Sequence, residues 1–173
     1  RMLWDKGVGE FVEAAKILEQ EGVETRFVLV GEGDSENPAS ISNSQLSEWN
    51  ALDTVEWWGE KNDMHKVLTQ AHIVCLPSYR EGLPKVLLEA ASCGRPIIAT
   101  DVPGCREIVD DGENGILVPL KDSIALANAI KELINNPKKR KSMGINGRKL
   151  VEREFSEETV VSQTLKVYQE LLT

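Results

Sequence analysis

The feature that most constrains the fold is a regular alternation between short apolar runs and amphipathic segments. The short runs are rich in β-branched residues and end in, or just before, glycine, proline or a polar residue, as buried strands do. They cover residues 26–31, 55–59, 73–77, 96–100 and 115–118. Strands that alternate with helices predict an α/β fold, in which a doubly wound, Rossmann-like parallel sheet has helices on both faces.

Apolar residues at helical spacing predict a helix over 8–18, one over 64–71 and one over 84–92. Three further helices are expected to complete the chain. Asp122 caps the first, Pro137 takes the first helical position of the second, and Ser156 caps the third. The last helix is expected to bury a stripe made of Val161, Leu165, Tyr168 and Leu172. Residues 32–45, rich in Gly, Ser, Asn and Pro, predict a polar loop.

Length and charge exclude several classes of protein. The chain has 173 residues and no long linker, so we expect one domain over residues 1–173. No apolar run approaches the roughly 18 residues of a membrane span, and no signal-peptide pattern follows Arg1. The net charge of −8 argues against nucleic-acid binding. We therefore expect a cytoplasmic protein.

Cysteine and histidine are too sparse for a metal centre or a disulfide framework. The cysteines are Cys75, Cys93 and Cys105, and their spacing matches neither a zinc site nor a paired set. The two histidines, His65 and His72, lie on or beside a predicted helix, where packing or surface roles are usual. We expect reduced thiols and no metal site.

The loop that follows the third predicted strand carries the richest chemistry. It runs from Pro77 through Gly82 into a helix, and ligands of doubly wound sheets bind outside the carboxyl ends of strands. Unpaired amides at a helix start favour anions, and glycine lets the backbone approach a ligand. Glu89 interrupts an otherwise apolar helix. It either pairs with Lys85 at i,i+4, faces solvent, or joins Glu81 in accepting hydrogen bonds from ligand hydroxyls.

These residues carry a resemblance to a known family. Glu81 and Glu89 are separated by seven residues, which resembles the E-x7-E motif of family 4 (group 1) retaining glycosyltransferases of the GT-B fold. Arg1 to Gly7 is similar to that family's Arg-x4-Lys-Gly segment. The surrounding segments match in the same order: Pro77-Ser78, Cys93–Thr100, Gly104–Val109 and Asn114–Pro119. The residues within these motifs resemble those of the branch of the family that builds bacterial surface polysaccharides or glycolipids.

The resemblance implies a role for each site residue. Arg1 and Lys6 would hold the diphosphate of a nucleotide-sugar donor, expected to be a UDP-sugar, and Glu89 would bind the ribose hydroxyls. Glu81 would be the catalytic residue, in contact with the donor sugar near the bond that breaks. Gly82, with the amides of Leu83 and Lys85 or the Lys85 side chain, would complete the phosphate site. No Asp-x-Asp occurs, so the resemblance implies no metal and no cofactor.

The chain also departs from the family pattern. Many relatives have glycine where this chain has Pro84, so one amide donor is lost. The match covers only the C-terminal, donor-binding half of a GT-B enzyme, and the family's first strand, expected just before Arg1, is missing. We therefore expect a fragment that lacks the acceptor domain and is inactive alone as a hexosyl- or N-acetylhexosaminyl-transferase. An acceptor sugar or lipid-linked glycan would be held by the absent domain.

Other interpretations stay open at this point. The basic run Lys138–Lys141 is typical of a solvated helix face, with contact to the inner face of a membrane as an alternative. A nucleotide-sugar 2-epimerase-like GT-B enzyme would share the architecture, although the shortage of histidine argues against it. A non-catalytic doubly wound interaction module would have no reason to combine Arg1, Lys6, Glu81 and Glu89.

Overall fold

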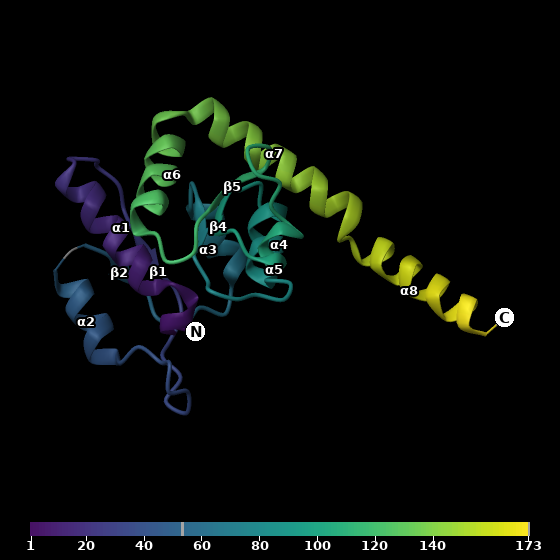
Figure 1. Cartoon of the computed structure of the whole chain (residues 1–173), viewed down its shortest axis with the longest axis horizontal. Coiled ribbons are helices and arrows are strands. Elements are labelled where there is room, and N and C mark those ends of the chain that lie inside the picture. The colour runs from purple at the N-terminus through teal and green to yellow at the C-terminus, as the bar shows by residue number, and fades with distance from the viewer. Residues whose placement is uncertain (53, 173) are drawn as a thin grey trace.

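The computed structural model describes residues 1–52 and 54–172. Helices and parallel strands alternate through most of the chain, and α8 extends away from the body after α7, which packs against α4 and α6 (Figure 1). In chain order the elements are η1 (Trp4–Lys6), α1 (Val8–Gln20), β1 (Val28–Leu29), α2 (Asn43–Ala51), β2 (Glu56–Trp57), α3 (Met64–Gln70), β3 (Val74–Leu76), α4 (Lys85–Ser92), β4 (Ile97–Thr100), α5 (Pro103–Arg106), β5 (Gly115–Val118), α6 (Ser123–Asn135), α7 (Pro137–Glu154) and α8 (Glu157–Leu171).

In residues 1–52 and 54–172, each of the five strands lies within or coincides with a predicted one, and the pairings between these strands are parallel. One sheet has the order β1-β2 and the other has the order β3-β4-β5. The register of the larger sheet joins Val74 to Ile97 and Ile97 to Gly115. The predicted α/β class with flanking helices is confirmed, with the strands divided between two sheets.

A cavity of about 1120 Å³ lies between the facing edges of the two sheets, lined by Val28 and Leu29 of β1 and by Val74 to Leu76 of β3. Met2 is bonded at the carboxyl end of β1, where its N–H donates to the Glu32 carbonyl at 2.8 Å. The strand expected before Arg1 stays a prediction.

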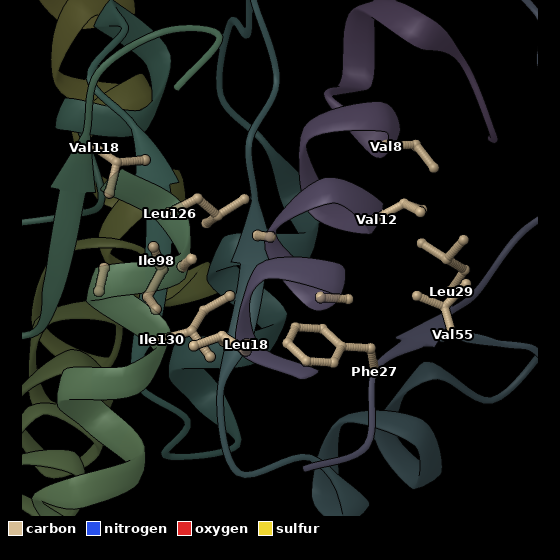
Figure 2. Close-up of a cluster of buried hydrophobic side chains, with 14 of the residues drawn as sticks. Val8, Val12, Leu18, Phe27, Leu29, Val55, Ile98, Val118, Leu126 and Ile130 are labelled. Atoms are coloured by element: carbon tan, nitrogen blue, oxygen red, sulfur yellow. The ribbon is translucent and has the colours of Figure 1, made fainter. Parts of the chain in front are cut away.

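In the main hydrophobic core, α1 packs against α6 and against strands of both sheets. Figure 2 shows Leu18 of α1 beside Ile130 of α6, while Val12 lies toward Leu29 of β1. Ile98 of β4 is fully buried in the same cluster. A second buried cluster, centred on Leu87 and the α4 alanines, covers the opposite face of the β3-β4-β5 sheet. Helices on both faces therefore hold the sheet rigid beneath the loops at its carboxyl edge.

The predicted helix starts are confirmed atom by atom. The Asp122 carboxylate accepts from the Ala125 amide at 2.8 Å, and the Ser156 hydroxyl accepts from the Thr159 amide at 3.2 Å. Pro137 occupies the first turn of α7, where proline's missing N–H has no intrahelical partner to lose. The Asp122 and Ser156 side chains therefore satisfy orphan amides in the first turns of α6 and α8.

Two predictions about elements were wrong. The loop predicted over 32–45 ends at Ser42, whose side chain caps α2, a helix that the sequence patterns did not indicate. The stripe expected to be buried on the last helix is exposed instead: Val161 51%, Leu165 54%, Tyr168 61% and Leu172 86%. The periodicity of α8 was identified correctly, but in the described chain it runs away from both hydrophobic clusters (Figure 1). An amphipathic pattern shows which face prefers burial and does not show what covers it.

Candidate functional site

An ion pair between distant segments marks the carboxyl edge of the β3-β4-β5 sheet. The Lys6 Nζ lies 2.7 Å from the Glu81 Oε1, and the two residues are 75 positions apart. Lys6 ends the 3-10 turn η1, and Glu81 lies in the loop between β3 and α4. The Glu81 side chain is only 12% exposed and that of Lys6 is 32% exposed. Partial burial makes this pair stronger than a surface pair, because solvent screens it less.

The loop that carries Glu81 is packed on both sides without room for side chains. A Cβ on Gly7 would lie 2.0 Å from the Pro77 carbonyl oxygen, and Gly7 has φ +68°. On the other side, a Cβ on Gly104 would lie 2.1 Å from the Gly82 carbonyl oxygen. The Thr100 hydroxyl also donates to the Ser78 carbonyl. This loop is therefore fixed by neighbouring backbone, which holds Glu81 opposite Lys6.

Tyr79 adds a further tie between the same two segments. Its backbone N–H donates to the Asp5 carbonyl at 2.8 Å, and its hydroxyl donates to the Glu10 Oε1 at 2.6 Å. Burial, reinforced by the neighbouring Glu10 carboxylate, raises the pKa of Tyr79 to about 12. The phenol is therefore protonated and a hydrogen-bond donor throughout the physiological pH range.

Glu89 lies on α4, and its side chain is 33% exposed. The Lys85 Nζ lies 3.5 Å from the Glu89 Oε1, which is the i,i+4 pair that the sequence left as one alternative. The Lys85 side chain is 88% exposed, and contacts of that kind contribute little to stability. The pair therefore leaves the Glu89 carboxylate available to a ligand that approaches the helix.

The remaining predicted residues differ in their surroundings. The Arg1 guanidinium is exposed and pairs with Asp34 at 2.9 Å. Gly82 is exposed, and a Cβ there would meet nothing within 4 Å, so the fold itself does not require glycine at this position. Leu83 is 52% exposed. Pro84 is the N-cap of α4 and has an extended backbone, so the helix begins at Lys85.

The structure brings five of the seven predicted residues to one cavity. Arg1, Lys6, Glu81, Lys85 and Glu89 all line the cavity that continues between β1 and β3, whereas Gly82 and Leu83 do not line it. Three cationic and two anionic side chains therefore line one cavity. Lys85 and Glu89 belong to α4, whose first amides have no intrahelical partner. Such a mixed edge suits a ligand with both phosphate and hydroxyl groups. The role of each residue stays a prediction.

Sequence reasoning missed three residues of this neighbourhood: Tyr79, Glu10 and Asp34. Tyr79 lies in the loop between β3 and α4, but its partner Glu10 is 69 positions away and follows an ordinary helical pattern. Asp34 was assigned to a polar loop. Neither the Tyr79–Glu10 bond nor the Arg1–Asp34 pair has a local sequence signal, because each depends on how two remote segments are brought together.

No group of three or more His, Cys, Asp or Glu in residues 1–52 and 54–172 is arranged to hold a metal ion. None of the helices within those ranges has the length and hydrophobicity needed to cross a bilayer.

Parallel strands flanked by helices, with charged residues gathered at the carboxyl edge of a sheet, are the architecture of Rossmann-like α/β domains. Comparison with known proteins makes the assignment specific. Residues 1–150 match the family described as glycosyl transferases group 1. The chain belongs to this family.

The comparisons also identify similar individual proteins. One is the N,N'-diacetylbacillosaminyl-diphospho-undecaprenol alpha-1,3-N-acetylgalactosaminyltransferase of Campylobacter jejuni, 33% identical over 172 residues, covering 99% of this chain and 43% of that protein. Sucrose-phosphate synthase from Thermosynechococcus elongatus has a TM-score of 0.79 at 29% identity, over 94% of this chain and 42% of that one. The pneumococcal O-GlcNAc transferase GtfA, solved with UDP and GlcNAc, has a TM-score of 0.82 at 24% identity, over 99% and 34%.

The fold is therefore the Rossmann-like α/β fold found in GT-B glycosyltransferases. The chain spans less than half the length of the curated relative and of both structures.

Proposed function

We propose that the chain is the donor-binding domain of a retaining glycosyltransferase that uses a nucleotide-diphosphate sugar, with UDP-sugars as the first candidates. The observation that carries the proposal is the partly buried Lys6–Glu81 pair, which shares one cavity with Arg1, Lys85 and Glu89. The names of the relatives support it, since the Campylobacter protein is named as an N-acetylgalactosaminyltransferase. The GtfA structure that contains UDP motivates UDP as the first probe.

The chemistry of glycosyl transfer matches this arrangement of charge. When the bond between the sugar and the diphosphate breaks, negative charge develops on the leaving diphosphate. Lys6 and Arg1 supply positive charge near this point, and the first amides of α4 add the positive end of a helix dipole. A fixed cationic site stabilises the leaving group without reorganising during the reaction.

The two carboxylates would serve different parts of the donor. Glu89 has two acceptor oxygens and suits the vicinal hydroxyls of a ribose. Glu81 is more buried and faces Lys6, so it is suited to contact the sugar close to the diphosphate. Lys6 and Glu81, which contact each other, would then lie together beside the bond that breaks. The finer assignments, to hexosyl or N-acetylhexosaminyl transfer and to surface polysaccharide or glycolipid synthesis, form part of the same proposal.

Calorimetry with UDP tests the proposal, together with a panel of UDP-, GDP- and ADP-sugars. Lys6→Ala should weaken nucleotide binding by about tenfold or more, because a charge-assisted contact to a phosphate is lost. Lys131→Ala is the matched control, since Lys131 also forms a 2.7 Å ion pair, with Glu21, on the α1–α6 side of the molecule. Equal losses in both variants, or no binding of any nucleotide by the native chain, would contradict the proposal.

The same panel separates the 2-epimerase-like alternative. Each UDP-sugar is incubated with the chain, and the sugar recovered is examined by NMR for inversion at C2. Recovery of the unchanged sugar is the result we expect. Appearance of the 2-epimer would replace the transferase proposal with the epimerase one.

A further inference from the structure

The loop that carries Glu81 is tied to the segment that carries Lys6 by more than the ion pair. Tyr79, two residues before Glu81, is bonded through its backbone to Asp5 and through its hydroxyl to Glu10. Asp5 precedes Lys6, and Glu10 lies one helical turn after it. The Tyr79 contacts and the Lys6–Glu81 contact therefore join the same two short segments, residues 5–10 and 77–81.

The partial burial of the Glu10 carboxylate makes its hydrogen bond with the Tyr79 hydroxyl important. The Glu10 Oε2 is buried and has no hydrogen-bond partner in the described chain, so Tyr79 serves the carboxylate through Oε1. A buried carboxylate is costly unless it is hydrogen-bonded. Glu10 stands in the first turn of α1, where the helix dipole favours a negative charge. The carboxylate therefore has a strong preference for keeping the phenol in place.

The ring of Tyr79 is held from another direction as well. The Lys121 Nζ lies 4.7 Å from the ring centroid, in a cation–π arrangement. Lys121 has φ 58°, the one non-glycine residue with positive φ in the described ranges 1–52 and 54–172. The phenol is thus fixed at its ring, its hydroxyl and its backbone amide, and Glu81 follows only two residues later.

We propose that Tyr79 is a positioning residue for Glu81, and that its hydroxyl, held by Glu10, sets the Glu81 carboxylate opposite Lys6. This inference rests on the proposed function in one respect only: it treats the Lys6–Glu81 pair as the place where the donor sugar and diphosphate meet. Tyr79 itself contacts neither. Because small displacements of reacting groups cost large factors in rate, a site of this kind gains from a rigid support next to its central carboxylate.

A ligand-free NMR measurement tests the positioning directly. The ζ-ammonium signal of Lys6 is assigned by its loss in Lys6→Arg, and Glu81→Gln gives the signal position of the broken pair. Tyr79→Phe keeps the ring and the backbone bond and removes only the hydroxyl. It should move the Lys6 signal at least halfway to the broken-pair position. Tyr168→Phe is the matched control, because Tyr168 is the other tyrosine of the chain and is exposed on α8.

Further variants keep the test decisive if the lone carboxylate impairs folding. Tyr79→Phe combined with Glu10→Leu removes both polar partners, a change that costs little stability when both groups are replaced. This double variant should show the same displaced Lys6 signal. The single variant Glu10→Gln keeps Tyr79 and an oxygen acceptor for its phenol, so the Lys6 signal should stay at its native position. A Lys6 signal that stays at its native position in Tyr79→Phe and in the double variant would overturn the inference.

Binding measurements separate this inference from the proposed function. If the native chain binds a UDP-sugar more tightly than UDP, Tyr79→Phe should reduce that preference by about fivefold, and it should have no further effect in a Glu81→Gln background. An unchanged preference, or an equal reduction in both backgrounds, would show that Tyr79 does not act through Glu81. Failure of the native chain to bind any nucleotide would contradict the proposed function, while the Lys6 signal would still decide the role of Tyr79.

Discussion

Glu81 and Glu89 are both carboxylates on one cavity, yet their surroundings differ. Glu81 is mostly buried against Lys6. Glu89 is more exposed, and its ion-pair contact is 3.5 Å long and made with the exposed side chain of Lys85. The fold therefore depends little on Glu89. A residue whose loss hardly affects folding is the one on which ligand binding can be tested most cleanly.

We predict that Glu89→Ala weakens UDP binding by about tenfold, since a hydrogen bond to a charged acceptor is worth roughly 1.5–3 kcal/mol. The melting temperature should stay close to that of the native chain. Glu152→Ala is the control, because Glu152 also forms an i,i+4 helix pair, with Arg148 at 2.8 Å. Calorimetry and a thermal melt on each variant decide the matter. Unchanged affinity together with a large drop in melting temperature would make Glu89 a structural residue.

Which parts of this site were predictable depends on whether the signal is local. The spacing of Glu81 and Glu89, and the position of Lys6 after Arg1, are readable in the sequence because they lie within short motifs. The Tyr79–Glu10 bond is not readable, because it joins residues 69 positions apart. Sequence reasoning can therefore nominate the charged residues of a site more easily than the contacts that hold them in place.

At the scale of single elements, β1 and β2 are joined at their edge by a charged pair. Arg26 lies just before β1, and its Nε and Nη2 donate to the two carboxylate oxygens of Glu56 of β2, at 2.6 and 2.8 Å. These hydrogen bonds, with a further one from the Trp58 indole, lower the pKa of Glu56 to about 2 from its ordinary value of 4.5. The pair is open to solvent, so its contribution to stability is small.

The lowered pKa predicts the sign of a pH effect. A carboxyl group whose pKa is lower in the folded state stabilises the fold above its unfolded pKa and loses this contribution as the pH falls toward the folded value. The Glu56 contribution should therefore be complete above about pH 4.5 and disappear toward pH 2. Urea denaturation of the native chain and Glu56→Gln across this range should converge at the acid end. Arg26→Gln should behave like Glu56→Gln, and a constant difference between native and variant at every pH would contradict the assignment.

Helices α6 and α8 show how similar patterns lead to different outcomes. Both are amphipathic and both are capped, by Asp122 and Ser156 respectively. Leu126 of α6 is 1% exposed in the core, whereas Leu165 of α8 is 54% exposed. The caps and periods of both helices were predictable, because they are local. The burial of α8 was not, since burial depends on which elements pack against the helix.

We predict that a matched pair of substitutions reveals this difference. Leu126→Ala should lower the free energy of unfolding by about 2–5 kcal/mol, as expected for a buried leucine. Leu165→Ala should change it by less than about 0.5 kcal/mol, because a surface substitution leaves no cavity. Chemical denaturation of the 173-residue chain measures both. A loss of several kcal/mol for Leu165→Ala would mean that α8 packs against a surface in solution.

At the scale of the whole molecule, the α/β class and the strands β1 to β5 followed from the alternation of patterns, because parallel sheets need a covering helix between strands. The division into two sheets, with a cavity between β1 and β3, was not predicted. Strand patterns report which segments are extended, and they do not report which edges remain unpaired. The sheet order and the depth of the site therefore needed the structure.

We predict that the 173-residue chain binds a donor but does not transfer sugar. Positioning of an acceptor supplies up to about 7–11 kcal/mol of the activation barrier. This chain spans less than half the length of the Campylobacter relative. Release of UDP from candidate UDP-sugars is measured with and without a lipid-linked acceptor. Release that depends on the acceptor would show that this segment alone forms a complete active site.

A nucleotide sugar should bind at the cavity that Lys6, Glu81 and Glu89 line. Backbone NMR during titration with UDP tests this most directly, since each amide reports its own surroundings. We expect the largest shifts in residues 5–7 and 81–89. These shifts should saturate together and should shrink in Glu89→Ala. Shifts that are absent, or that concentrate on α2 or α8 while these segments stay unchanged, would contradict it.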